Sequence, residues 1–235
     1  MTETEAGEGG GKGSGSPVPG TESPRAVVGI GASAGGLAAL EQFFSHLPPD
    51  TGMTFIVVIH MDPTGISLLP EILQRFTAMP VVQIRDRMQF RPNSVYVIPP
   101  GFYLSIADST LFLYQIPMTR PRPWMTIDRF FRDLAETQDS RAVAIILSGT
   151  DHDGTLGIRS MKENLGTVMV QEPRSAEFSG MPESAIATGL VDYIAPAGDL
   201  PRLLTGYGEF IGKIPIAKMP TPEVNQPALF HIFSL

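Results

Sequence analysis

The stretch AVVGIGASAGGLAAL, residues 26–40, carries the strongest fold signal in the chain. Its first part, residues 26–31, is a short apolar run ending in glycines, which is typical of a buried strand that leads into a tight turn. Apolar residues then recur at helical spacing over residues 37–47. The stretch therefore predicts a strand, a glycine-rich turn and a helix, which is the repeating unit of an α/β fold.

The same alternation of apolar runs and amphipathic segments continues along the chain. Further strands are predicted at 53–60, 81–84, 142–149, 166–171 and 191–195, and further helices at 67–76, 126–137, 154–165, 182–189 and 200–211. Continuously apolar strands indicate a parallel sheet with helices on both faces. Residues 94–115 differ, because PPG and ADS turns break their β-rich runs, and they predict antiparallel hairpins inserted at an edge. The expected fold class is α/β, with a doubly wound, mostly parallel, Rossmann-like sheet.

The chain of 235 residues divides into one domain and two flanking segments. Residues 1–24 are rich in Gly, Ser, Glu and Pro and lack apolar periodicity, so we expect a disordered tail or linker. Residues 25–212 hold all the predicted elements and form one domain. Residues 213–235 are a Pro-rich C-terminal tail ending in ALFHIFSL, whose composition leaves open whether it docks on the domain or on a partner.

Composition excludes several classes of function. The absence of cysteine rules out thiol catalysis, disulfides and thiolate metal sites, and it favours a reducing, cytoplasmic location. A net charge of −7 argues against a nucleic-acid partner. No apolar run approaches the roughly 18 residues of a membrane span, and the start does not resemble a signal peptide, so no membrane insertion is expected. Four scattered histidines give no ligand spacing, so neither a metal nor another cofactor is expected.

Three side chains follow predicted strands, where open α/β sheets form their sites. Ser33 lies in the turn GASAGG, whose glycines allow a substrate to approach and whose helix start favours an oxyanion. His60 is the last residue of the predicted strand at 53–60 and can act as a general base near neutral pH. Asp153 lies in the turn SGTDHDG after the strand at 142–149 and can orient the imidazole. Together they predict a nucleophile, a base and an acid on one sheet edge.

Each of these residues also has a structural explanation. His60 can merely end a strand, and Asp153 can merely cap the following helix. Asp151 is a second candidate for the acid. The chain order Ser, His, Asp also differs from the order Ser, acid, His of the α/β-hydrolase superfamily, so the G-x-S-x-G match alone is a weak signal.

Five motifs carry a more specific signal: VVGIGASAGGLAAL, VVIHMDP, FRPNSVYVIPPG, ILSGTDHDGTLG and GMPESAI. In order and spacing they resemble the catalytic domain of CheB, the chemoreceptor protein-glutamate methylesterase, from residue 25 or so to about 210. The HMDP and SGT-x-x-DGTLG motifs are closer to CheB-like domains fused to CheR methyltransferase and sensor-kinase modules. Such modules are therefore candidate partners.

The resemblance implies a hydrolase that removes methyl groups from glutamate γ-methyl esters on cytoplasmic helices of chemoreceptors and releases methanol. Many family members also deamidate receptor glutamines. The resemblance assigns the nucleophile to Ser33, the base to His60, the acid to Asp153 and the backbone oxyanion donors to Ala34 and Thr150. Met181 and Pro182, in the GMP turn, are expected to form a wall of the site.

The chain departs from the family pattern in four places. The family often has methionine where Thr150 stands, a change that a backbone N–H contribution would survive. Asp151 and His152 put an extra acid and an extra imidazole beside the site. Residues 122–128 read RPWMTID where the family usually has Arg or His followed by Pro-Ser-Val-Asp, so the substrate groove is expected to differ. The polar N-terminal tail stands where the family usually carries a phosphoacceptor receiver domain, which leaves control by phosphorylation within the chain unsupported.

Two other classes of function stay open. One is a dinucleotide-binding module, since Gly29, Gly31 and Gly35 follow a strand in a loosely Rossmann-like spacing. Against it, His60 rather than an acidic residue ends the second strand. The other is a catalytically silent interaction domain in a signalling protein, against which the intact set of Ser, His and Asp argues.

Overall fold

The main sheet of the domain has seven strands in the order β10-β9-β8-β1-β2-β5-β3, and all neighbouring strands are parallel. The computed structural model describes residues 23–62, 65, 67–117 and 125–211. The strands are β1 (Val27–Ala32), β2 (Thr54–Ile59), β3 (Val81–Gln83), β5 (Ser94–Val97), β8 (Ala142–Ile146), β9 (Thr167–Gln171) and β10 (Tyr193–Ala195). The predicted α/β class with a mostly parallel sheet is confirmed.

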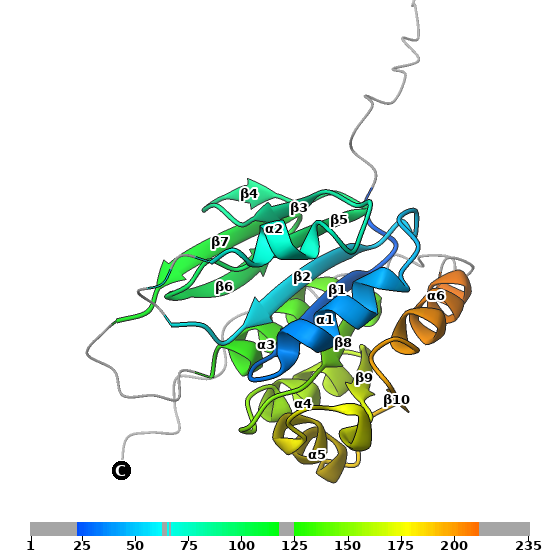
Figure 1. The fold of residues 1–235 in the computed structure, drawn as a ribbon. Helices are drawn as coiled ribbons and strands as arrows, with labels where there is room; N and C mark the ends of the chain where they lie inside the picture. The colour runs from blue at the N-terminus through cyan, green and yellow to red at the C-terminus, as the bar shows by residue number, and fades with distance from the viewer. Residues whose placement is uncertain (1–22, 63–64, 66, 118–124, 212–235) are drawn as a thin grey trace, which may run out of the picture.

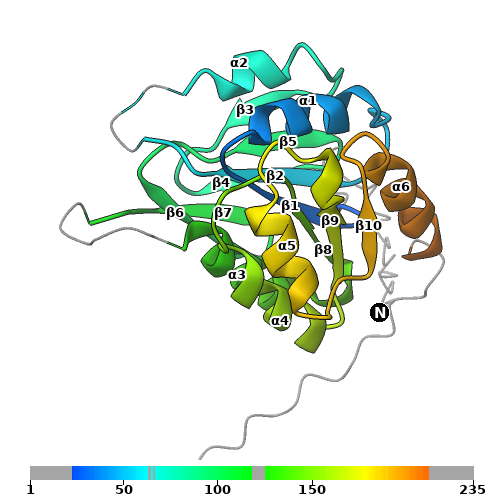
Figure 2. The same cartoon turned by 60° about the horizontal axis from the view of Figure 1, so that its bottom comes forward.

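Helices cover both faces of this sheet, as Figures 1 and 2 show. One face carries α1 (Gly36–Ser45), α2 (Leu69–Leu73) and α6 (Leu200–Ile211), and the other carries α3 (Thr126–Gln138), α4 (Thr155–Glu163) and α5 (Gly180–Ala187). Two short 3-10 helices, η1 (Asp139–Arg141) and η2 (Pro173–Ser175), complete the set. Each face has its own buried apolar cluster. Because both faces are covered, the central strands are apolar at nearly every position.

The segment 94–115 is only partly as predicted. Its first strand, β5, is not part of a hairpin: it joins the main sheet in parallel with β2 and β3, and all of its residues are buried. The rest forms the expected hairpin of β6 (Phe102–Ala107) and β7 (Thr110–Gln115). A short strand that periodicity does not reveal, β4 (Met88–Gln89), pairs with β7 and completes a separate three-stranded antiparallel sheet.

Gly29 and Gly31 owe their presence to helix packing. A Cβ atom on Gly29 would lie 2.7 Å from the ring of Phe130, and one on Gly31 would lie 2.5 Å from Ile127. Both neighbours belong to α3, so the two glycines let this helix approach the central strand closely. Two of the three glycines whose spacing suggested a dinucleotide-binding turn are therefore explained by the packing of α3 against β1.

Some expectations fall on residues that the structure does not describe. The tails predicted at 1–24 and 213–235 lie outside the described residues, apart from residues 23 and 24. Within the described ranges, no helix is both long and apolar enough to cross a membrane. The helix predicted at 67–76 is shorter than expected, since α2 has five residues.

Gly31→Ala is expected to lower the free energy of unfolding by about 1–3 kcal/mol, because the new methyl group overpacks the contact with α3. The matched control is Gly206→Ala in α6, where a Cβ atom would meet nothing within 4 Å. This control is expected to be neutral or stabilising by up to about 1 kcal/mol, because alanine favours a helix. Urea denaturation measures both changes, and equal effects would contradict the packing explanation.

Candidate active site

The ends of three neighbouring strands bring the predicted site residues together. β1 lies between β2 and β8. Ser33 follows β1, and its N–H donates to the Ser148 carbonyl at 2.9 Å, while the N–H of His60, which follows β2, donates to the Ala32 carbonyl at 3.2 Å. Asp153 lies in the loop between β8 and α4. The three side chains therefore meet at one edge of the sheet.

Asp153 is buried, with 1% of its surface exposed, and its carboxylate accepts four hydrogen bonds. Oδ2 accepts from His60 Nε2 at 2.7 Å and from the Ile127 N–H at 2.9 Å. Oδ1 accepts from the N–H groups of Asp128 at 2.8 Å and Gly154 at 2.9 Å. Since Ile127 and Asp128 lie in the first turn of α3, Asp153 caps a helix distant in sequence rather than only the following one.

The partners of Asp153 favour its ionised form. Burial alone would raise the pKa of this carboxyl, but the hydrogen bonds from His60 and from the N–H groups of Ile127 and Asp128 bring it below its ordinary value. The helix N-terminus adds positive potential at the same place. Asp153 is therefore a carboxylate at neutral pH.

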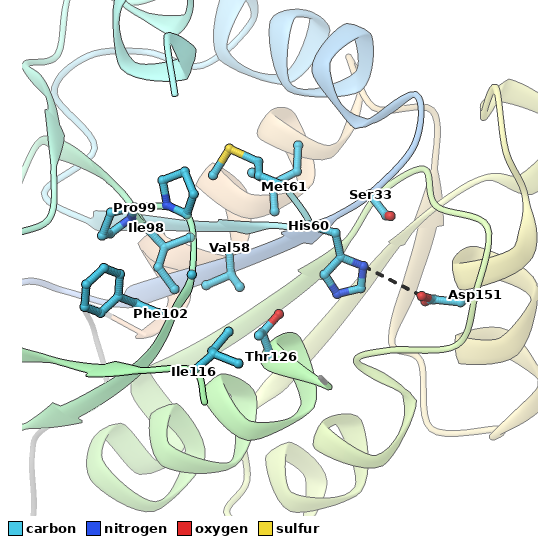
Figure 3. A pocket seen from close by; sticks show the side chains of 13 residues that line it. Ser33, Val58, His60, Met61, Ile98, Pro99, Phe102, Ile116, Thr126 and Asp151 are labelled. Atoms are coloured by element: carbon cyan, nitrogen blue, oxygen red, sulfur yellow. Dashed lines mark ion pairs between the residues drawn. The ribbon is translucent and has the colours of Figure 1, made fainter. Parts of the chain in front are cut away.

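The ionised Asp153 determines the tautomer of the neutral His60 ring. A carboxylate only accepts hydrogen bonds, so Nε2 of His60 carries the hydrogen and Nδ1 is the basic nitrogen. Nδ1 lies 3.7 Å from Asp151 Oδ2, and the Asp151 side chain is 35% exposed. Figure 3 shows Ser33 and Asp151 on the side of the ring that carries Nδ1. The second candidate acid is thus farther from the ring and more solvated than Asp153.

The turn that carries Ser33 leads directly into α1. Gly35 has φ = 69°, in the left-handed region that favours glycine, and the Gly36 N–H donates to the Ser33 carbonyl at 2.9 Å. In the part of the chain that the structure describes, the N–H groups of Ala34 and Thr150 have no hydrogen-bond partner. These two groups are therefore available to an oxygen atom of a bound molecule.

Ser148 is a buried serine that the sequence analysis missed. Its hydroxyl donates to the Ala34 carbonyl at 2.8 Å and accepts from the Phe178 N–H at 3.0 Å. Its own N–H donates to Gln171 Oε1 at 2.9 Å. Ser148 thus ties the turn of Ser33 to the segment before α5. The available signal was a serine directly after the apolar run AVAIIL.

A pocket of about 260 Å³ opens beside Ser33 and His60 (Figure 3). Most of its wall is apolar, with side chains from Val58, Met61, Ile98, Pro99, Phe102 and Ile116. Among the described residues that line it, only His60 and Asp151 are titratable. The described residues also hold no cluster of three or more His, Asp or Glu suited to a metal ion. The pocket suits an uncharged group with an apolar part.

Met181 and Pro182 lie behind this site and are not among the residues that line the pocket. Both are buried in the first turn of α5. A Cβ atom on Gly149 would strike the Met181 sulfur and would lie 3.0 Å from the Ser33 Cβ. Met181 therefore supports the Gly149 backbone beside Ser33, and the GMP turn is a support rather than the wall that was expected.

The fold and this edge define a class of protein, namely α/β domains that carry a serine, a histidine and a buried aspartate after neighbouring parallel strands, the three residue types of a serine-hydrolase triad. The model of the CheB methylesterase family matches residues 28–204. The chain belongs to the CheB methylesterase family.

Individual relatives agree with this membership. A protein-glutamate methylesterase/protein-glutamine glutaminase of Geobacillus kaustophilus is 33% identical over 73% of this chain and 50% of its own length. A 104.1 kDa protein of Rhodobacter capsulatus is 41% identical over 53% of this chain but only 13% of its own. The crystal structure of the Thermotoga maritima CheB methylesterase catalytic domain has a TM-score of 0.71 and 29% identity, and the match covers 79% of this chain and all of that one. The chain thus spans half of one curated relative and a small part of another.

Asp153→Asn is expected to lower the free energy of unfolding at pH 7 by about 1–3 kcal/mol, because a buried acceptor of four hydrogen bonds loses its charge. The folded-state pKa is depressed, so this stabilisation is complete above the ordinary pKa of about 4 and is lost as the pH falls through the folded value. The difference between the wild type and the variant should therefore close in acid.

Urea denaturation at a series of pH values measures this difference. The matched control is Asp151→Asn, which removes a carboxylate two residues away that is only partly buried. It should change stability little. A difference between the wild type and Asp153→Asn that stays constant from pH 7 to pH 3 would contradict the assignment of charge to Asp153.

Proposed function

We propose that this domain is a protein-glutamate methylesterase, which hydrolyses γ-methyl esters of glutamate side chains on the cytoplasmic helices of chemoreceptors. The observation that carries the proposal is the 2.7 Å hydrogen bond between His60 and the buried Asp153, at the edge where Ser33 ends the neighbouring strand. Membership of the CheB methylesterase family and the printed activity of the Geobacillus relative support it.

The reaction begins with attack of the Ser33 hydroxyl oxygen on the ester carbonyl. Nδ1 of His60 takes the hydroxyl proton, while Asp153 stabilises the imidazolium through Nε2. The carbonyl oxygen becomes an oxyanion, and the N–H groups of Ala34 and Thr150 donate hydrogen bonds to it. Each such donor lowers the barrier by about 3–4 kcal/mol.

The tetrahedral intermediate then collapses. The bond between the carbonyl carbon and the methoxy oxygen breaks, and that oxygen leaves as methanol with the proton from His60. Water, deprotonated by His60, attacks the acyl-enzyme ester, and the products are free Ser33 and a glutamate carboxylate. Asp151, the charged side chain beside the ring, disfavours the anionic product more than the neutral ester.

The same steps convert a glutamine side chain to glutamate with ammonia as the leaving group. The name of the Geobacillus relative pairs both activities, so we include glutamine deamidation in the proposal. We place the reaction in the cytoplasm, where a chain without cysteine and its receptor substrate would meet. In the 104.1 kDa Rhodobacter relative the matched region is only 13% of the chain, which supports a CheB-type domain within a longer protein, and we propose CheR or sensor-kinase modules as the partners.

Ser33→Ala is expected to reduce methanol release from methyl-labelled receptor membranes by about 10,000-fold or more, because the nucleophile is removed. The matched control is Ser45→Ala at the exposed end of α1, whose hydroxyl donates only to the Glu41 carbonyl. That variant should keep wild-type activity. Equal release from the wild type and Ser33→Ala would exclude the serine mechanism, and equal release at the uncatalysed background would favour a silent interaction domain.

Asp153→Asn is expected to lower kcat by about 10,000-fold, because the amide cannot stabilise the imidazolium or hold its tautomer. Asp151→Asn should cost less than about tenfold, since this carboxylate lies 3.7 Å from the ring and is partly solvated. Kinetics on a methyl-esterified receptor fragment compare the two variants. A larger loss for Asp151→Asn would transfer the role of the acid to Asp151.

A further inference from the structure

Asp128 is a second buried carboxyl group next to the site, and the reaction described above does not use its side chain. It lies in the first turn of α3 and is 3% exposed. Its Oδ1 accepts a hydrogen bond from the Gly157 N–H of α4 at 2.8 Å. Its Oδ2 is buried without a hydrogen-bond partner. A buried acid with one free oxygen calls for an explanation.

Asp128 and Asp153 cap each other's helices. Asp153, in the loop before α4, accepts from the N–H groups of Ile127 and Asp128 at the start of α3. Asp128, inside α3, accepts from Gly157 in the first turn of α4. Each carboxyl group thus satisfies N–H groups that a helix start leaves unpaired, and each does so for the other element. These hydrogen bonds hold the N-termini of α3 and α4 next to each other.

The two helices touch where this exchange takes place. A Cβ atom on Gly157 would lie 2.6 Å from the Phe131 Cβ and 3.0 Å from the Asp128 carbonyl oxygen. Gly154, which precedes α4, has φ = 97°. Both glycines of the DGTLG motif are therefore required by the approach of α4 to α3, and a side chain at 157 would separate the two carboxyl groups from their donors.

The surroundings of the two carboxyl groups shift their pKa values in opposite directions. Burial, and next the charge of Asp153, raise the pKa of Asp128, which its hydrogen bond from Gly157 only partly opposes. The pKa of Asp153 moves in the opposite direction. Two neighbouring acids whose environments separate their pKa values take different roles. Asp153 carries the charge that faces His60, and Asp128 contributes an acceptor oxygen to the start of α4.

We propose that Asp128 is a positioning residue for the reaction: by capping α4 with its carboxyl group, it holds the start of α3 against the Asp153 loop and so fixes the Asp153 carboxylate on His60. This role rests on the proposed methylesterase function only for its catalytic consequence. The position of the Asp153–His60 hydrogen bond depends on Asp128 whether or not the domain hydrolyses esters.

Three variants of the full chain test this role. Asp128→Asn keeps an uncharged acceptor oxygen, Asp128→Ala removes the acceptor, and Gly157→Ala separates the helices without changing either carboxyl group. The matched control is Asp192→Ala, which loosens the far end of α4 by removing the partner of Lys162 at 2.7 Å and of the Val168 N–H at 2.8 Å. Gly157→Ala also replaces Asp128→Ala if that variant does not fold.

The first measurement needs no substrate. The proton on His60 Nε2, hydrogen-bonded to Asp153, gives a downfield proton resonance. It should persist in Asp128→Asn and in Asp192→Ala, and it should broaden or disappear in Asp128→Ala and Gly157→Ala. If the wild type shows this pattern but hydrolyses no ester, the positioning role stands and the proposed function fails.

The second measurement is the pH profile of kcat and KM on the methyl-esterified receptor fragment. Asp128→Ala should lower kcat by about 10- to 100-fold with KM nearly unchanged, since it displaces a catalytic group rather than the substrate. Its acid limb should move to lower pH, because a displaced Asp153 stabilises the imidazolium less. Asp128→Asn should keep kcat within about threefold and keep the profile.

Two results would overturn the proposal. If Asp128→Ala and Gly157→Ala keep both the resonance and the pH profile and lose only thermal stability, as Asp192→Ala should, then Asp128 serves stability alone. If Asp128→Asn is as damaging as Asp128→Ala, an acceptor oxygen at residue 128 is not sufficient to position Asp153, and the capping role fails.

Discussion

The structure depends on one buried charge, the Asp153 carboxylate. It joins β2 through His60, α3 through the first N–H groups of that helix, and the β8–α4 loop on which it sits. A buried carboxylate that lost these donors would be destabilising by several kcal/mol, so the ionised group is tolerated only where all of them converge. The same carboxylate therefore fixes both the position of the α3 N-terminus and the orientation of the imidazole. A change to either contact is expected to disturb the other.

The position of the site could be predicted from the sequence because parallel strands end at a common edge. Ser33 and His60 were found at the end of a strongly apolar run and Asp153 in the loop after a third, and these runs contain β1, β2 and β8 at the centre of the sheet. The predicted run 142–149 extends beyond β8 (Ala142–Ile146) because Leu147 and Ser148 stay buried after the ladder ends. The sequence pattern indicates which residues are buried, and here the buried run extends beyond the last residue of the paired strand.

Features set by distant partners could not be predicted. β5 has the composition of a hairpin strand, and only its pairing with β2 and β3 places it in the main sheet. Asp153 precedes a helix and has the sequence signal of a local cap, but its main acceptor role is toward α3, 25 residues or more away. The choice of Nδ1 as the basic nitrogen follows from the same contact. A single sequence contains no local signal for any of these three arrangements.

Many of the hydrogen-bond donors at the site are main-chain N–H groups, and this determines which side chains can be replaced. The proposed oxyanion donors are the N–H groups of Ala34 and Thr150, and the main-chain donors that hold Asp153 come from Ile127, Asp128 and Gly154. Replacing the side chain at 150 leaves its N–H in place, so the chemistry tolerates that change. Gly149 cannot be replaced in the same way, because a Cβ atom there would clash with the Met181 side chain and would lie 3.0 Å from the Ser33 Cβ. Selection at this edge should therefore act on backbone conformation and on glycines more strongly than on the polar side chains around the pocket.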